Sequence, residues 1–301
     1  MQHQAHRKNL SLLGVASLLC LLFLHAGCSN ETEPAVAPSA NTTEVLVAES
    51  GELTSTADAD IEVFFQTYFD SELAESPEHQ TSLGLKTADS GQWDDRSDAG
   101  TAREVQRYRD YLAALQAFDR NALSAANQLS YDLLEFELIA QLRDLAWYRH
   151  SYVVDQFNGQ VTNRLSLLLN QHTVDNARDA VHYIERIRGL GAVFTDTVAR
   201  LRDRAEFGVL TPSFAYPDML NDIGGLDKGT PIQDTGEPHI LLQDLAAKLS
   251  RTTLAESEQA ELLVEAGEAL RGEYKEGLDA LLVELERQAE MSQGSNGVWS
   301  L

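Results

Sequence analysis

Histidine is the first residue type to search for catalytic or metal-binding chemistry, because its imidazole binds transition metals and exchanges protons near neutral pH. The sequence has eight histidines, and none is followed by glutamate, so the His-Glu-x-x-His zinc helix is absent. His182 and Glu185, one helical turn apart, form a possible pair of metal ligands. No second pair accompanies them, so the pattern favours a solvated helix face. His79 and His239 each follow a proline closely, which is typical of loops and helix starts.

Other catalytic patterns are also missing. The sequence has no Gly-x-Ser-x-Gly elbow and no phosphate-binding loop, and Gly189-Leu190-Gly191 lacks the third glycine of a dinucleotide site. Carboxylate pairs can be drawn almost anywhere among 47 acidic residues, so no pair identifies a general acid and base. We therefore predict no catalytic residue, no metal ligand and no cofactor in this chain.

The charge balance narrows the possible partners. A formal net charge of −24, without a concentrated basic stripe, argues against nucleic acid. The same charge opposes electrostatic adhesion to anionic lipid, so any membrane attachment must be covalent or hydrophobic.

The N-terminus predicts such an attachment. A basic pair, Arg7 and Lys8, precedes a predominantly apolar run of fifteen residues from Leu10 to Leu24, a length that suits the apolar region of a signal peptide and is short for a membrane span. Ala26-Gly27-Cys28 then resembles the bacterial lipobox, although His25 stands where that pattern prefers leucine. We expect residues 1–27 to be removed and Cys28 to carry the lipid, with ordinary signal-peptide cleavage as the alternative.

The residue after Cys28 and the next thirty residues extend this prediction. Ser29, rather than aspartate, resembles the sorting signal for the outer membrane, so we expect a protein anchored in the cell envelope that faces the periplasm or the exterior. Residues 28–58 are rich in Ser, Thr, Ala, Glu and Pro and predict a flexible tether with a reach of about 30 Å. Cys20 lies in the removed segment, so Cys28 has no disulfide partner in the mature chain.

The remaining residues, 59–301, predict an all-α domain. Its central element is expected at about 124–149, starting at Ser124 as N-cap. Apolar side chains fall on two opposite sides of this helix, so we expect other helices to cover both sides. One side carries Leu129, Leu133, Phe136, Ala140 and Trp147, and the other carries Tyr131, Leu134, Leu138, Leu142 and Leu145.

Further helices are expected on both sides of this element. Before it, the spacing predicts helices at 59–75, at 78–83 and from the capping box of Thr101 and Glu104 onward. After it, the pattern of residues 152–171 is ambiguous between strand and helix. Two helices, 173–188 and 190–207, are expected to meet near Gly189 and Gly191. Thr211-Pro212 is expected to start a helix at 213–223. Residues 224–238 predict a long exposed loop. A long C-terminal helix at about 254–291 has a seam of Leu263, Leu270, Tyr274, Leu281 and Leu285, which favours packing within one chain over an intermolecular coiled coil.

Several segments together resemble the bacterial family called Domain of Unknown Function 885. They are Glu75-Ser76-Pro77-Glu78, Ser82-Leu83-Gly84, Leu129-Ser130-Tyr131-Asp132-Leu133-Leu134, Gly208-Val209-Leu210-Thr211-Pro212, Tyr274 and Gly297-Val298-Trp299-Ser300-Leu301. The resemblance implies a secreted or lipid-anchored, zinc-peptidase-like protein, about twice as long, with a deep cleft between two helical halves. Its zinc motif, of His-Glu and Pro-Gly-His-His type, has no counterpart in this sequence.

From this resemblance we expect the N-terminal, non-catalytic half of such a fold, forming a wall of the cleft. Zinc is expected only in full-length family members, and a peptide-like substrate only where the C-terminal half is present. The alternative is a stand-alone binding module on the envelope surface, which requires that no apolar face be left uncovered.

Overall fold

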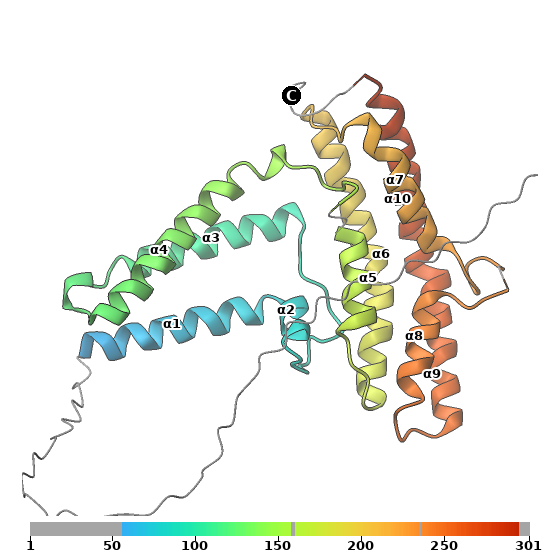
Figure 1. The fold of residues 1–301 in the computed structure, drawn as a ribbon, viewed down its shortest axis with the longest axis horizontal. Helices are drawn as coiled ribbons and strands as arrows, with labels where there is room; N and C mark the ends of the chain where they lie inside the picture. The colour runs from blue at the N-terminus through green and yellow to red at the C-terminus, as the bar shows by residue number, and fades with distance from the viewer. Residues whose placement is uncertain (1–55, 158–159, 235, 295–301) are drawn as a thin grey trace, which may run out of the picture. The chain divides into compact units, whose positions relative to one another are not determined.

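The computed structural model describes residues 56–157, 160–234 and 236–294. These residues form helices joined by turns and loops, and no β-strand occurs among them, so the predicted all-α class is confirmed (Figure 1). The predicted signal peptide, Cys28 and nearly all of the predicted tether lie outside the described residues. The first helix begins at Thr56, inside the last positions assigned to the tether.

Three helices near the N-terminal end of the described chain share one hydrophobic cluster. They are α1 (Thr56–Ala74), α3 (Asp98–Leu115) and α4 (Ala125–Leu145), with the short α2 (Pro77–Ser82) following α1. Their buried side chains are Ile61, Tyr108, Leu115, Leu123, Tyr131 and Leu138. Ring contacts among Phe64, Tyr68 and Tyr111 extend the cluster between α1 and α3.

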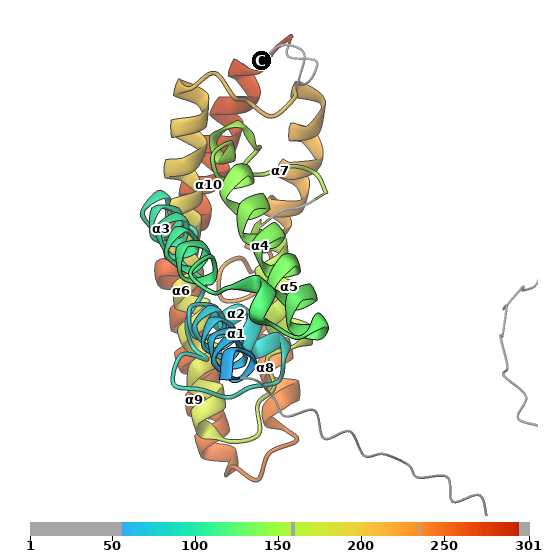
Figure 2. The same cartoon turned by 90° about the vertical axis from the view of Figure 1, so that its left-hand side faces the viewer.

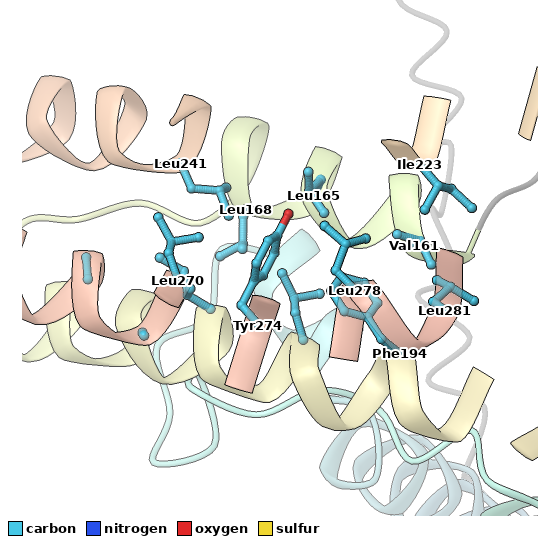
Figure 3. Packing of buried hydrophobic residues seen from close by; sticks show 14 of the residues in the cluster. Val161, Leu165, Leu168, Phe194, Ile223, Leu241, Leu270, Tyr274, Leu278 and Leu281 are labelled. Atoms are coloured by element: carbon cyan, nitrogen blue, oxygen red, sulfur yellow. The ribbon is translucent and has the colours of Figure 1, made fainter. Parts of the chain in front are cut away.

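The larger core belongs to the helices that follow. These are α5 (Gln160–Asn170), α6 (Ala177–Glu206), α7 (Tyr216–Gly224), α8 (Ile240–Leu249), α9 (Glu256–Ala269) and α10 (Lys275–Met291). Figures 1 and 2 show α6 running alongside α9 and α10. Figure 3 shows the middle of this core, where the Phe194 and Tyr274 rings meet edge to face with their centroids 5.4 Å apart.

Helix α6 corrects the prediction of two helices at 173–188 and 190–207. It is one continuous helix from Ala177 to Glu206, with Gly189 and Gly191 inside it. A Cβ atom on Gly191 would lie 2.2 Å from the carbonyl oxygen of Glu273, so the glycine permits backbone contact between α6 and the C-terminal helices. Gly277 faces Gly191 at the same crossing. Both glycines therefore serve close packing, and neither ends a helix.

Helix α4 corrects a second prediction, that both of its apolar sides are covered. The side carrying Tyr131 and Leu138 packs in the cluster with α1 and α3. Leu129, Leu133 and Phe136 on the other side are 60%, 60% and 71% exposed. We call these three residues the α4 stripe. The prediction failed because α1 and α3 both lie against the same side of the helix.

The predicted C-terminal helix packs within the chain as expected, but it is not one continuous helix. Leu270, Tyr274, Leu281 and Leu285 of the predicted seam are fully buried within this chain. A π-helical turn, Leu270–Tyr274, separates α9 from α10, and Gly272 inside it has non-helical backbone angles. Gly267, Gly272 and Gly277 interrupt the sequence of this helix, a pattern that is compatible with either a helix break or a close approach of a neighbouring backbone.

Helix starts were predicted with mixed success. Ser124 caps α4 as expected, its side chain accepting a hydrogen bond from the Asn127 amide. Helix α3 begins three residues before Thr101, because Ser97 caps it instead. The Thr211 hydroxyl donates to the Val154 carbonyl at 2.9 Å rather than capping a helix. Helix α8, which no pattern predicted, follows a loop closed by an isolated pairing of Thr230 with Pro238.

Candidate functional site

The residues singled out as possible metal ligands do not converge. His182 is buried, whereas Glu185 is exposed, so the predicted solvated face is wrong for His182. His79 is exposed in α2, and His239 is fully buried as the N-cap of α8. Within the described residues no group of three or more His, Cys, Asp and Glu side chains is arranged to hold a metal ion.

No helix among the described residues has the length and apolar content to cross a membrane. The predicted lipid site, Cys28, lies outside the described part of the chain.

A strongly charged hollow lies between the end of α1, the start of α3, the turn after α4 and the C-terminal half of α6. We call it the polar hollow; its volume is about 280 Å³. It is lined by Glu72, Glu75, Ser76, Asp94, Asp95, Arg96, Gly100, Thr101, Arg103, Glu104, Arg107, Tyr108, Leu145, Tyr148, Ser151 and Arg200. Because charged and hydroxyl side chains dominate this lining, the hollow suits a polar ligand.

One arginine fixes the loop that forms part of this hollow. Arg186 of α6 is fully buried, and its guanidinium donates to the Pro77 carbonyl at 3.1 Å, the Thr81 hydroxyl at 2.8 Å and the Gln92 carbonyl at 3.0 Å. Burial lowers the pKa of Arg186 to about 10, which leaves it charged at neutral pH. The rigid fork of guanidinium donors thus ties α2 and the segment before α3 to α6.

A second buried arginine holds the same region from α5. The Arg164 Nε atom donates to Glu78 Oε1 at 2.9 Å, and the guanidinium lies over the Trp93 ring. The Trp93 indole in turn donates to the Arg186 carbonyl at 2.9 Å, and the Trp93 ring packs against the larger core.

Most of the carboxylates around the hollow are paired with arginines. Arg107 Nε lies 2.6 Å from Glu72 Oε1, and Arg103 pairs with Asp95. Arg96 lies 3.1 Å from Asp94. Positively and negatively charged side chains therefore lie next to one another around the hollow. This arrangement favours a ligand that carries both hydrogen-bond donors and acceptors over a simple ion.

Local contacts set the protonation of these groups. Hydrogen bonds from Ser97 hold the pKa of Asp95 below its usual range. Burial and the nearby Glu104 carboxylate raise the pKa of Tyr108, whose hydroxyl donates to Glu104 at 3.1 Å. Burial and the neighbouring Arg204 guanidinium lower the pKa of Arg200. At neutral pH the Asp95 carboxylate is therefore ionised and the Tyr108 phenol is neutral.

The hydroxyl groups of the hollow are bonded to carboxylates. The Ser76 hydroxyl donates to Asp94 at 3.2 Å, and the Tyr108 hydroxyl donates to Glu104 at 3.1 Å. Sequence reasoning did not find these residues. The spacing of Arg103, Arg107 and Tyr108 on one predicted helix was the single available signal, and it is also the pattern of an ordinary solvated face.

Comparisons with known proteins place the chain among bacterial proteins without an assigned activity. The family model described as "Bacterial protein of unknown function (DUF885)" matches residues 77–297. A sequence search of curated proteins finds no match.

One similar solved structure is that of a "putative lipoprotein" from Colwellia psychrerythraea, with a TM-score of 0.68 and 12% identity over 82% of this chain. At that identity the likeness shows the fold alone. The matched region makes up 44% of the Colwellia chain, so the present chain spans less than half of that protein.

Proposed function

Because the chain belongs to the DUF885 family of bacterial proteins of unknown function, we propose that its helical region is the non-catalytic N-terminal portion of a lipid-anchored, peptidase-like protein. In this proposal the region forms one wall of the substrate cleft. The zinc expected of full-length family members would be held outside this region, since the described residues do not supply a suitable set of ligands. Anchoring through Cys28 in the outer membrane is part of the same proposal.

The observation that carries the proposal is the paired lining of the polar hollow. A peptide backbone alternates hydrogen-bond donors and acceptors, so it is complemented by a surface that alternates acceptors and donors. In a complex, carboxylates such as Glu75 and Glu104 would accept hydrogen bonds from peptide amides, and Arg107 would donate to peptide carbonyls. Pairing of Arg107 with Glu72 keeps both side chains in place before a ligand arrives.

The α4 stripe favours this proposal over a stand-alone binding module. Leu129, Leu133 and Phe136 form a run of exposed apolar side chains along one side of α4. A self-sufficient module is expected to leave no such side uncovered. The Colwellia protein, in which the matched region is 44% of the chain, has additional chain to supply a cover.

The first test separates a wall from a complete enzyme. The purified chain is loaded with zinc, dialysed and analysed for bound metal, and is then assayed against a peptide mixture with and without a chelator. We expect less than about one tenth of an equivalent of zinc and no hydrolysis that the chelator removes. Stoichiometric zinc together with chelator-sensitive hydrolysis would overturn the proposal.

The second test concerns binding at the polar hollow. Titration with an uncharged, capped alanine pentapeptide is followed by nuclear magnetic resonance for the unmodified chain, for Arg107→Gln, and for Arg143→Gln as control. Arg143 is an exposed arginine of α4 that does not line the hollow. We expect Arg107→Gln alone to weaken binding. Equal affinity in all three proteins would remove the hollow from the proposal.

A further inference from the structure

A second hollow, which we call the apolar groove, lies between α5, the loop at 225–238 and the first turn of α8. Its volume is about 530 Å³, within the usual range for sites that bind small organic ligands. Its apolar surface comes from Leu165, Leu169, Leu226, Pro238 and Ile240. Leu165 is buried and Ile240 is 50% exposed, so the groove has a packed floor and an open rim.

Backbone hydrogen bonds tie together the described residues of the loop on one side of the groove, 225–234 and 236–238. The Thr230 amide donates to the Glu237 carbonyl at 2.8 Å, and the His239 amide donates to the Thr230 carbonyl at 2.8 Å. Gly229 has φ 104°, and a Cβ there would lie 2.6 Å from the His239 Cα atom, so the loop crosses itself where a side chain would not fit.

His239 fixes this loop to α8. Its ring is fully buried, with Nε2 3.0 Å from the Leu226 carbonyl oxygen and Nδ1 accepting from the Leu241 amide at 3.2 Å. Burial lowers the pKa of His239, in keeping with a neutral ring that donates through Nε2 and accepts through Nδ1. Because Leu226 and Ile240 lie beside these bonded positions, the groove is formed before a ligand arrives.

Among the described residues that line the groove there is one cationic side chain, that of Lys228. Lys228 is exposed and makes no ion pair or side-chain hydrogen bond within the described residues. Its neighbour Asp227 instead lies 3.7 Å from Lys275 and accepts a hydrogen bond from Gln233. The Lys228 ammonium is therefore available to an anionic group at the edge of the apolar surface.

We propose that the apolar groove binds a ligand with an apolar body and one carboxylate, which pairs with Lys228. Lys228 is a single cation, so one carboxylate on the ligand is enough to pair with it. A medium-chain fatty acid and the apolar C-terminal residue of a peptide share this chemistry. The inference does not depend on the proposed function, because the residues that line the apolar groove are different from those that line the polar hollow.

The experiment uses two probes, decanoate and acetyl-Ala-Ala-Leu with a free carboxylate, each paired with its neutral amide. Binding to the full chain is measured by nuclear magnetic resonance titration and calorimetry. Lys228→Gln removes the cation, Ile240→Ser removes part of the apolar surface, and Arg251→Gln is the control at the other end of α8, outside the groove. Circular dichroism establishes that each variant remains folded.

We expect saturable binding of at least one carboxylate at one site per chain. Lys228→Gln should weaken that binding about fivefold, the scale of an exposed ion pair, and should leave binding of the neutral amide unchanged. Ile240→Ser should weaken acid and amide together, and Arg251→Gln should change neither. The probe that binds identifies the source of the ligand. Failure of both acids to bind, or equal affinity in Lys228→Gln, overturns the proposal.

Discussion

Replacement of Leu138 by alanine is expected to destabilise the chain far more than the same replacement at Leu133, five residues earlier in α4. Leu138 is fully buried among Ile61, Tyr108 and Leu115, so truncation leaves a cavity in that cluster. Such substitutions cost about 2–5 kcal/mol. Leu133 is 60% exposed and belongs to the α4 stripe, so its truncation gives up a minor part of a leucine side chain's transfer free energy, below about 1 kcal/mol.

The comparison is well matched because both positions are internal to one helix. Leucine and alanine have similar helix propensities, with alanine slightly favoured, so the propensity term cancels between the two variants. Urea unfolding followed by far-ultraviolet circular dichroism measures the free energy of unfolding of each protein. The slopes should agree, so the difference will appear in the midpoints.

The result that would refute this reasoning is equal destabilisation by the two variants. Equal losses would mean that the stripe side of α4 is covered in solution, as sequence periodicity predicted and the structure does not show. A concentration-dependent unfolding midpoint would then identify another copy of the chain as the cover.

Two further predictions concern the larger core. Gly191→Ala should destabilise the chain by about 1–3 kcal/mol, because the added Cβ meets the Glu273 backbone. Gly224→Ala is the control, since no atom lies within 4 Å of the new methyl group. In the same urea assay it should be neutral or stabilising by up to about 1 kcal/mol. Equal losses at both glycines would contradict the close crossing. Burial lowers the pKa of His172 in the folded chain to about 4, from 6.5 in the unfolded chain. As pH drops below 6.5, the unfolded chain binds a proton at this histidine and the folded chain does not, so the free energy of unfolding falls. This group should make the free energy of unfolding at pH 7 larger than at pH 5 by up to about 2 kcal/mol. His172→Gln should remove that difference. An unchanged pH dependence in the variant would argue against a buried neutral ring.

The sequence predicted a feature correctly where the interaction responsible joins residues that are close together in the chain. Ser124 caps α4 because its hydroxyl reaches an amide three residues away, which any helix start with that residue permits. Gly191 was misread because its cause is distant: the backbone that excludes a side chain belongs to Glu273, far along the chain. The two sides of α4 were correctly located by periodicity, but a period does not tell which side receives a neighbour.

The polar hollow was beyond sequence reasoning for a related reason. Its lining comes from α1, the segment before α3, α3 itself, the turn after α4, and α6. No two of these segments carry a joint motif, and the pairing of Arg107 with Glu72 depends on how α3 packs on α1. The absence of a His-Glu zinc helix was visible in the residues, whereas a binding surface built from ordinary charged side chains was not.

The π-helical turn at Leu270–Tyr274 has a consequence for how insertions and deletions would act on this fold. Gly272 has φ −88° and ψ −119°, outside the helical region, so the chain is kinked between α9 and α10. The turn fixes which side of α10 meets the core, and that side carries Leu278, Leu281 and Leu285. The turn therefore sets the rotational register of the last helix, and in this region a change in length would be more disruptive than most changes of residue type.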